Sequence, residues 1–194
     1  MTATCIALEG PDGVGKSTVA ATLKELFQSR TTAPYSDVRI RHFPTDELTT
    51  CAQSENHRLK AEDYVRDMEN WLALRAEPET LYILDRWVLS TAVYASLRGE
   101  PLPENTALTL NWLNRVPLTT FVLMPRDPAE LTDPDFPGPD PYNPLPVAEE
   151  YRKFLTNAFV SGAFSSYIPI AVDRAVDTPE SVAAKIAGRL TELM

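Results

Sequence analysis

The sequence predicts an α/β fold, in which a five-stranded parallel sheet is flanked by helices on both faces in a three-layer α/β/α arrangement. Two observations predict it. Short runs rich in β-branched and large apolar residues alternate along the chain with longer helical patterns, which is typical of a parallel sheet covered by helices. A glycine-rich turn, GPDGVGKST at residues 10–18, lies between the first apolar run and the first helical pattern, as in loops that bind phosphate at a helix N-terminus.

The strands are expected where the apolar runs lie, at residues 4–8, 38–42, 81–85, 119–124 and 167–172. Each run is short and apolar enough for a strand that is buried on both faces. Helices are expected at residues 16–29, about 57–76, 86–97, 104–113, 147–160 and 179–193. The last helix has a clear start, because Thr178 is a capping residue, Pro179 suits the first turn and Glu180 suits its positive dipole.

Two polar segments, residues 44–56 and 132–146, interrupt this alternation. The second, TDPDFPGPDPYNPLP, is dominated by proline and aspartate and is expected to form neither a regular helix nor a central strand. It is either a stiff surface loop or a lid over phosphates, extending over about residues 126–146. Because it is too short to separate two domains, residues 1–194 are expected to form one.

The composition excludes several classes of protein. A net charge of -9 argues against a general basic surface that binds nucleic acid. No apolar stretch approaches the length that spans a bilayer, and the N-terminus lacks the basic region and apolar core of a signal peptide. Cys5 and Cys51 form no C-x-x-C pair, which favours reduced cytosolic thiols. We therefore expect a cytoplasmic protein with small-molecule ligands and neither nucleic acid nor membrane partners.

The glycine-rich loop matches G-x-x-x-x-G-K-[ST]. In this pattern the backbone N–H groups point at phosphate, the lysine reaches the outer phosphates, and the following hydroxyl is placed to ligate magnesium. Ser17 is therefore an expected Mg²⁺ ligand. The expected ATP-binding residues are Gly10, Gly13, Val14, Gly15, Lys16, Ser17 and Thr18.

Asp85 is the second expected metal ligand. It ends the apolar run at residues 81–84, at the edge where open parallel sheets bind ligands. Its carboxylate is suited to hold magnesium directly or through water, or else to cap the helix that follows. The phosphate-binding loop favours the metal-binding alternative.

Residues 85–94 read D-R-W-x-x-S-T-x-x-Y, and the loop has Asp12 at its third position. This combination resembles thymidylate kinases, which transfer the terminal phosphate of ATP to thymidine monophosphate. The resemblance continues in Trp71 and Arg75, four positions apart, in Phe43-Pro44 and in the final strand and helix. It implies a P-loop NTPase fold, Mg²⁺ with ATP as co-substrate, conversion of dTMP to dTDP for DNA precursor synthesis, and a homodimer.

The resemblance also implies catalytic roles for Asp12, Lys16 and Arg86, and roles for individual residues of the acceptor site. Asp12 would contact the deoxyribose 3′-hydroxyl and organise the phosphate and magnesium, although it also suits a turn. Trp71 would stack on the pyrimidine, and Arg75 would donate to a thymine carbonyl. The alternative for Trp71 is a core position, because it continues the helical spacing of Tyr64 and Met68.

The other implied acceptor residues are Phe43, Arg86, Thr91 and Tyr94. Arg86 would bind the acceptor phosphate through its fork of donors, and Tyr94 would crowd the ribose 2′ position. Thr91 would bond the base, or pack within its helix. Phe43 would form a wall of the acceptor site, or simply end a buried strand.

The chain departs from the family pattern at three places. No arginine follows Phe43-Pro44, and Arg39 and Arg41 are the nearest replacements. Neither the loop, which has Val14, nor residues 132–146 supply a catalytic cation, so Arg126 is the leading candidate and Arg152 the second. Trp71 replaces the common phenylalanine, which affects the room left for a base.

These departures keep alternatives open. The acceptor is dTMP or another or modified deoxynucleotide. A deoxynucleoside kinase would instead need Asp85 or Glu9 as general base. A nucleotide-binding module without catalysis is the remaining alternative.

Overall fold

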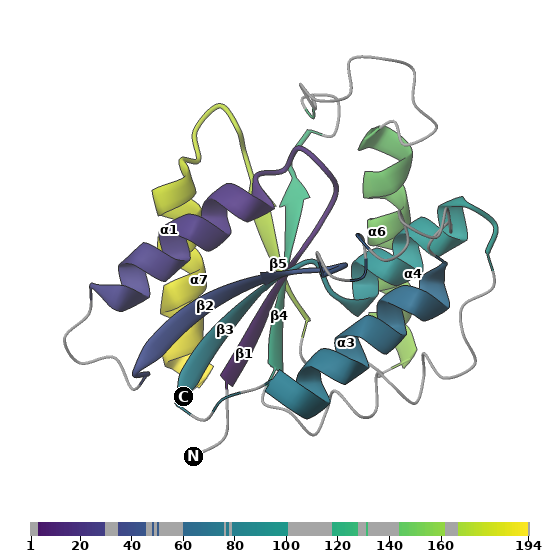
Figure 1. The fold of residues 1–194 in the computed structure, drawn as a ribbon. Coiled ribbons are helices and arrows are strands. Elements are labelled where there is room, and N and C mark those ends of the chain that lie inside the picture. Colours follow the sequence, from purple (N-terminus) through teal and green to yellow (C-terminus); the bar gives the residue numbers. More distant parts are fainter. Residues whose placement is uncertain are drawn as a thin grey trace.

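Five parallel strands form one sheet in the order β2-β3-β1-β4-β5 (Figure 1). The computed structural model describes residues 4–29, 35–45, 48, 50, 60–75, 77, 79–100, 118–127, 131, 144–161 and 167–193. The strands are β1 (Thr4–Glu9), β2 (Asp37–His42), β3 (Thr80–Asp85), β4 (Leu118–Pro125) and β5 (Tyr167–Val172). All four neighbouring pairs are parallel. The predicted five-stranded parallel sheet is confirmed, and no predicted strand end differs by more than one residue.

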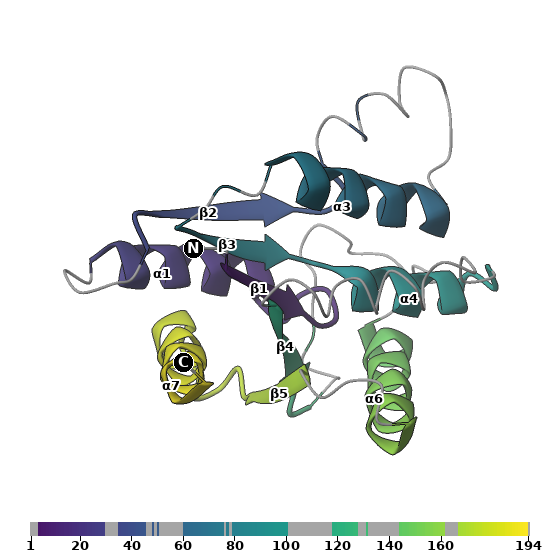
Figure 2. The ribbon, with the colours of Figure 1, turned by 90° about the horizontal axis from the view of Figure 1, so that it is seen from below.

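Helices cover both faces of the sheet, which confirms the three-layer prediction (Figure 1 and Figure 2). Helices α1 (Lys16–Gln28) and α7 (Pro179–Leu193) pack together on one face. Helices α3 (Ala61–Arg75), α4 (Val88–Leu97) and α6 (Pro144–Ser161) lie on the other. Within the described residues, none of the helices has the length and apolar character needed to cross a membrane.

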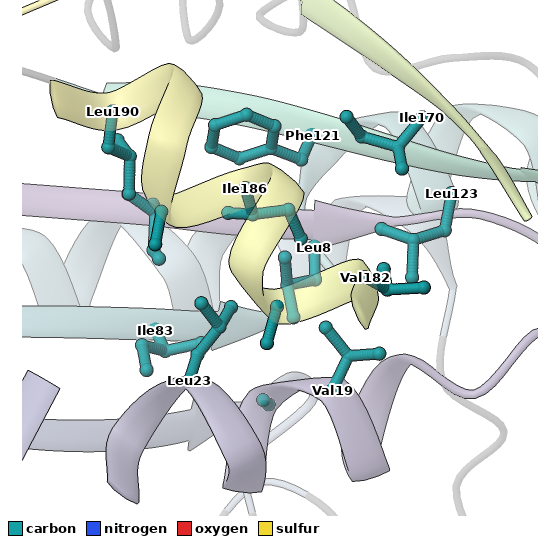
Figure 3. Packing of buried hydrophobic residues seen from close by; sticks show 14 of the residues in the cluster. Leu8, Val19, Leu23, Ile83, Phe121, Leu123, Ile170, Val182, Ile186 and Leu190 are labelled. Atoms are coloured by element: carbon teal, nitrogen blue, oxygen red, sulfur yellow. The ribbon is translucent and has the colours of Figure 1, made fainter. Parts of the chain in front are cut away.

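The alternation of side chains along β1 decides which residues meet which helices. Ile6 and Leu8 join the buried cluster under α1 and α7, where they pack with residues such as Leu23 and Ile186 (Figure 3). Cys5 and Ala7 belong to the cluster on the opposite face. Successive side chains of a strand point to opposite faces. Alternate residues of β1 therefore belong to the buried clusters on the two sides of the sheet.

Three helix starts differ from the sequence prediction, and helix α3 begins at Ala61 rather than at about residue 57. Helix α4 begins at Val88 rather than residue 86, because Arg86 has φ 71° and Trp87 is extended. Helix α6 begins at Pro144, so the prediction of irregular structure for residues 144–146 is wrong. Prolines are tolerated there because N–H groups of a first helical turn have no acceptor within the helix. The expected helix 104–113 and lid residues 132–143 lie outside the described residues.

Candidate phosphate-binding and acceptor site

The loop between β1 and α1 has a backbone that requires glycine. Gly10 has φ 138°, and a Cβ atom there would lie 2.3 Å from the carbonyl oxygen of Leu123. Gly13 and Gly15 also have positive φ, at 75° and 92°, where other residues are strained. Helix α1 starts directly after the loop, and its Val19 N–H donates to Gly15 O at 2.9 Å. The loop therefore leads into a helix N-terminus, as phosphate binding requires.

Lys16 lies over the loop that it ends. Its ammonium group donates to Gly10 O at 2.9 Å and to Pro11 O at 2.8 Å, and lies 3.7 Å from Asp12 Oδ1. Burial, and then the nearby Arg86 charge, lower the pKa of Lys16 to about 8. The Asp12, Asp85 and Glu9 charges act in the opposite direction, and a phosphate group beside this buried ammonium would favour its charged form further.

Ser17 and Asp85, the two expected metal ligands, are in contact although 68 positions separate them. The Ser17 hydroxyl donates to Asp85 Oδ2 at 2.6 Å, and His42 Nδ1 lies 3.4 Å from the same oxygen. Burial acts to raise the pKa of Asp85, but hydrogen bonds from His42 and Ser17 hold it below its usual value. The carboxylate therefore stays ionised.

The second carboxylate oxygen of Asp85, Oδ1, makes Asp85 and Ser17 suitable ligands for magnesium. Asp85 Oδ1 is buried and has no hydrogen-bond partner within the described part of the chain. Buried oxygens are rarely left without a partner, so such an atom requires an explanation. A carboxylate oxygen beside a hydroxyl is the kind of hard donor set that Mg²⁺ takes together with phosphate oxygens and water. The ligand role of Ser17 and Asp85 stays a prediction.

Asp12, Arg86 and Tyr94 form a cluster next to Lys16. Arg86 Nη2 donates to Asp12 Oδ1, and the Tyr94 hydroxyl donates to Asp12 Oδ2 at 2.5 Å. The Arg86 guanidinium carbon also lies 5.4 Å from the centre of the Tyr94 ring, within cation–π range. The structure thus brings together three residues that the sequence assigns to the acceptor side.

The electrostatics of this cluster favour the charged forms of Asp12 and Arg86. Burial acts to raise the pKa of Asp12, but Arg86, Lys16 and the Tyr94 hydrogen bond outweigh it and lower the pKa. Arg86 is also held in the left-handed backbone region, with its N–H donating to Leu8 O at 3.0 Å. A non-glycine residue there is strained and is often functional.

Phe43 and Trp71 lie in an aromatic cluster with Tyr82 and Trp87. Their exposed fractions are 1% and 3%. Phe43 contacts Trp71 and Trp87 edge to face, with ring centres 5.7 and 5.1 Å apart. This packing fits the core alternative for both residues, and their contact with a base stays a prediction.

Thr91 is buried within α4, which fits the packing alternative. Nothing is described of the Arg75 side chain, and the backbone of Arg75 ends α3. The base-binding roles of both residues remain predictions.

The candidate replacement cations lie elsewhere in the described chain. Arg39 is paired with Asp37 and Glu77, each at 2.6 Å. Arg126 is 75% exposed and pairs with Asp173 at 3.0 Å, after β5. Arg152 is exposed on α6. Among the described contacts, none joins Arg126 to the phosphate-binding loop, so its catalytic role requires a movement and stays a prediction.

Sequence reasoning gave no role to His42, Ser90 or Tyr151, and it considered Glu9 only as an alternative general base. His42 beside Asp85 could have been found from strand register, because the two are opposite each other in neighbouring strands. Glu9 lies fully buried against Ser90 of α4 and Tyr151 of α6. The period of two in β1 indicates its face, but no local pattern indicates its partners.

Comparison with known proteins agrees with the observed fold. A family model described as an AAA domain matches residues 5–139. No curated protein sequence matches the chain. The chain resembles the thymidylate kinase from Candida albicans with a TM-score of 0.68 and 14% identity, over 98% of this chain and 92% of that one.

Two further solved structures are similar. The thymidylate kinase from Ehrlichia chaffeensis has a TM-score of 0.64 and 15% identity, over 98% of this chain and 100% of that one. The YorR protein from Bacillus subtilis, solved in complex with phosphorylated GDP, has a TM-score of 0.63 and 22% identity, over 97% and 96%. The fold of the chain is therefore the fold of thymidylate kinases, as the sequence resemblance predicts.

Proposed function

Because the chain belongs to the AAA domain family and has the fold of thymidylate kinases, we propose that it is an ATP-dependent kinase of deoxynucleoside monophosphates, with dTMP as the first candidate. The observation that carries this proposal is the shared carboxylate of Asp12. Its Oδ1 atom meets Lys16 on the donor side and Arg86 on the acceptor side. A donor phosphate and an acceptor phosphate would thus lie close enough for transfer.

On the donor side, the loop N–H groups and Lys16 would hold the phosphates of ATP. Ser17 and Asp85 would hold Mg²⁺, which when bound neutralises charge on the phosphate oxygens. Lys16 would also stabilise the charge that develops on the transferred group.

On the acceptor side, Arg86 would exchange its bond to Asp12 for bonds to the acceptor phosphate. Guanidinium groups bind phosphate through two parallel N–H donors, and the contact with the Tyr94 ring holds the Arg86 plane in place. The attacking oxygen of a monophosphate is already anionic, so no strong general base is needed.

The geometry favours a monophosphate over an unphosphorylated nucleoside. A nucleoside kinase needs a base near the 5′-hydroxyl. Both oxygens of Glu9 are occupied by Ser90 donors in a fully buried position. Asp85 already accepts a hydrogen bond from Ser17. The other oxygen of Asp85, Oδ1, has no hydrogen-bond partner among the described residues, but in this proposal Asp85 binds Mg²⁺, so neither carboxylate would serve as the base.

The identity of the base is a separate proposal. Trp71 in place of phenylalanine makes other deoxynucleotides the second candidates, and the phosphorylated GDP in the YorR structure supports including guanine among the bases tested. Arg126 or Arg152 would supply the missing catalytic cation. The homodimer and the cytoplasmic location remain proposals from the sequence resemblance.

A coupled ADP-release assay with a panel of nucleoside monophosphates, and with thymidine, tests the proposal. We expect turnover with dTMP or another deoxynucleoside monophosphate and none with thymidine. Lys16→Ala should lower kcat by about 100-fold or more, whereas Lys24→Ala, on the same helix, should not. Absence of turnover with every deoxynucleotide would overturn the kinase proposal, and preference for thymidine would overturn the monophosphate as acceptor.

A further inference from the structure

Three buried polar side chains form a continuous hydrogen-bonded chain beneath the site. The exposed fractions of Glu9, Ser90 and Tyr151 are 0%, 4% and 0%. The Ser90 backbone N–H donates to both Glu9 carboxylate oxygens at 3.1 Å, and the Ser90 hydroxyl donates to Oε2. The Tyr151 hydroxyl lies 2.7 Å from Ser90 Oγ and 3.5 Å from Glu9 Oε2. Each oxygen of this chain therefore has a partner.

The chain joins three parts of the proposed machinery. Glu9 is the last residue of β1 and directly precedes Gly10 of the loop. Ser90 lies in the first turn of α4, about one helical turn before Tyr94, and Arg86 lies two residues before the helix begins. Tyr151 lies on α6. The donor loop, the acceptor helix and α6 are thus connected at one point.

Glu9 is buried and depends on the Ser90 donors, so a displacement of Glu9 relative to α4 would be strongly unfavourable. Burial raises the pKa of Glu9, while the Ser90 donors and the Lys16 and Arg86 charges act in the opposite direction. If α4 moved away, the carboxyl group would lose its donors in a place that water does not reach. Buried polar groups without partners are strongly unfavourable, so the contact fixes the helix.

Asp12 also links the loop to the acceptor side, through Arg86 and through Tyr94 of α4, and in the proposed reaction its bond to Arg86 would be replaced. Asp12 binds Arg86, yet an acceptor phosphate competes for the same guanidinium group. No phosphate can compete for Ser90, because the Glu9 contact is buried. The buried chain, together with the Tyr94–Asp12 hydrogen bond, would therefore hold α4 in place when the Asp12–Arg86 contact is exchanged.

We propose that Glu9, Ser90 and Tyr151 are positioning residues that hold the acceptor helix α4 and α6 at a fixed place relative to the phosphate-binding loop. This inference rests on the proposed kinase function. None of the three touches a substrate in it. Their effect is on the alignment of the Arg86-bound acceptor with the Lys16-bound donor, and misplacement by about 1 Å costs on the order of 100-fold in rate.

Tyr151→Phe is the sharpest test, because it removes one hydroxyl and keeps the ring. We expect kcat to fall about tenfold or more, while the KM values for ATP and dTMP stay within about twofold. The matched control is Tyr82→Phe. Tyr82 is 1% exposed, and its hydroxyl accepts from the Glu77 N–H at 3.0 Å, away from Glu9. This control should keep the wild-type kcat.

A second variant distinguishes positioning from simple destabilisation. Ser90→Ala breaks the same chain, so the double variant Ser90→Ala/Tyr151→Phe should lose little more kcat than the more affected single variant. Unchanged kcat in Tyr151→Phe, or a rise in one KM with kcat unchanged, would overturn the inference. So would losses of kcat that multiply in the double variant.

Amide hydrogen exchange, which does not require turnover, tests the positioning role separately from the kinase proposal. In the wild type, the magnesium complex of the ATP analogue AMP-PNP should slow amide hydrogen exchange in the loop and in residues 86–94. In Tyr151→Phe, we expect slowing in the loop alone. Equal slowing of residues 86–94 in both proteins would overturn the positioning role, whereas failure of the wild type to turn over any monophosphate would overturn the kinase function.

Discussion

The core beneath α1 and α7 is built from aliphatic and aromatic side chains, whereas the opposite face, beneath α3, α4 and α6, also buries carboxyl and hydroxyl groups. Strand β1 shows the difference: Ile6 and Leu8 join the first core, and Glu9 meets Ser90 and Tyr151 on the second face. Apolar burial stabilises in proportion to area, but buried polar groups need partners in fixed positions. The comparison teaches that one face mainly stabilises the fold and the other mainly positions the site.

The largest expected effect is on the second face. Arg86→Gln should lower kcat/KM for the acceptor by about 100-fold to 1000-fold, as for loss of one donor to a reacting group. Steady-state kinetics with dTMP measure it. Arg98→Gln is the control, because Arg98 is paired with Glu100 at the far end of α4 and should leave kcat/KM unchanged. An equal loss in both variants would contradict the assignment.

A substitution in the core beneath α1 and α7 should lower stability and leave catalysis nearly unchanged. Leu23→Ala removes a fully buried side chain from α1 and should lower the free energy of unfolding by about 2–5 kcal/mol. Urea denaturation measures the loss, and kcat of the folded enzyme should stay near the wild-type value. Leu26→Ala, at a partly buried position of the same helix, should cost less. A large fall in kcat in Leu23→Ala would break the distinction between the faces.

Acid should weaken the Asp12 contact that joins the loop to α4. Burial acts to raise the pKa of Asp12, but Arg86, Lys16 and Tyr94 lower it overall. A lowered pKa in the folded state adds stability above the unfolded value of about 3.9, and this stability is lost as pH falls through the folded pKa. Asp12→Asn should therefore flatten the pH dependence of the unfolding free energy below about pH 4.

Urea denaturation at several pH values measures this effect. Glu149→Gln, at an exposed position of α6, is the control and should give a curve parallel to that of the wild type. A parallel curve for Asp12→Asn would contradict a lowered pKa of Asp12 in the folded protein.

The smallest expected effect is a gain on the first face. Gly188 lies within α7, and a Cβ atom there would meet no atom within 4 Å. Gly188→Ala should therefore raise the free energy of unfolding by about 0.5–1 kcal/mol, because alanine favours the helix. Thermal unfolding measures the gain, and kcat should not change. The matched variant Gly10→Ala should destabilise instead, because its Cβ would strike Leu123 O.

Local pattern was sufficient for most of the sheet and for the loop. Strands that are buried on both faces appear as apolar runs, and glycines mark the turn between β1 and α1, so both could be predicted from neighbouring residues. The start of α6 was not predicted, because Pro144 and Pro146 suggest irregular structure unless they are known to occupy a first helical turn. The motif residues Asp12, Arg86 and Tyr94 were recognised by their spacing, but spacing did not show that they share contacts.

The sequence by itself determined the α/β class, the strand positions, the phosphate-binding loop and the residue types at the acceptor side. Those features depend on periods of two and of 3.6 residues and on glycine chemistry, which act between near neighbours. Only the tertiary structure decided that Ser17 meets Asp85, that Arg126 pairs with Asp173, and that Glu9 has partners on two helices. Such contacts join residues far apart in the chain, so their geometry depends on how the whole sheet and its helices pack.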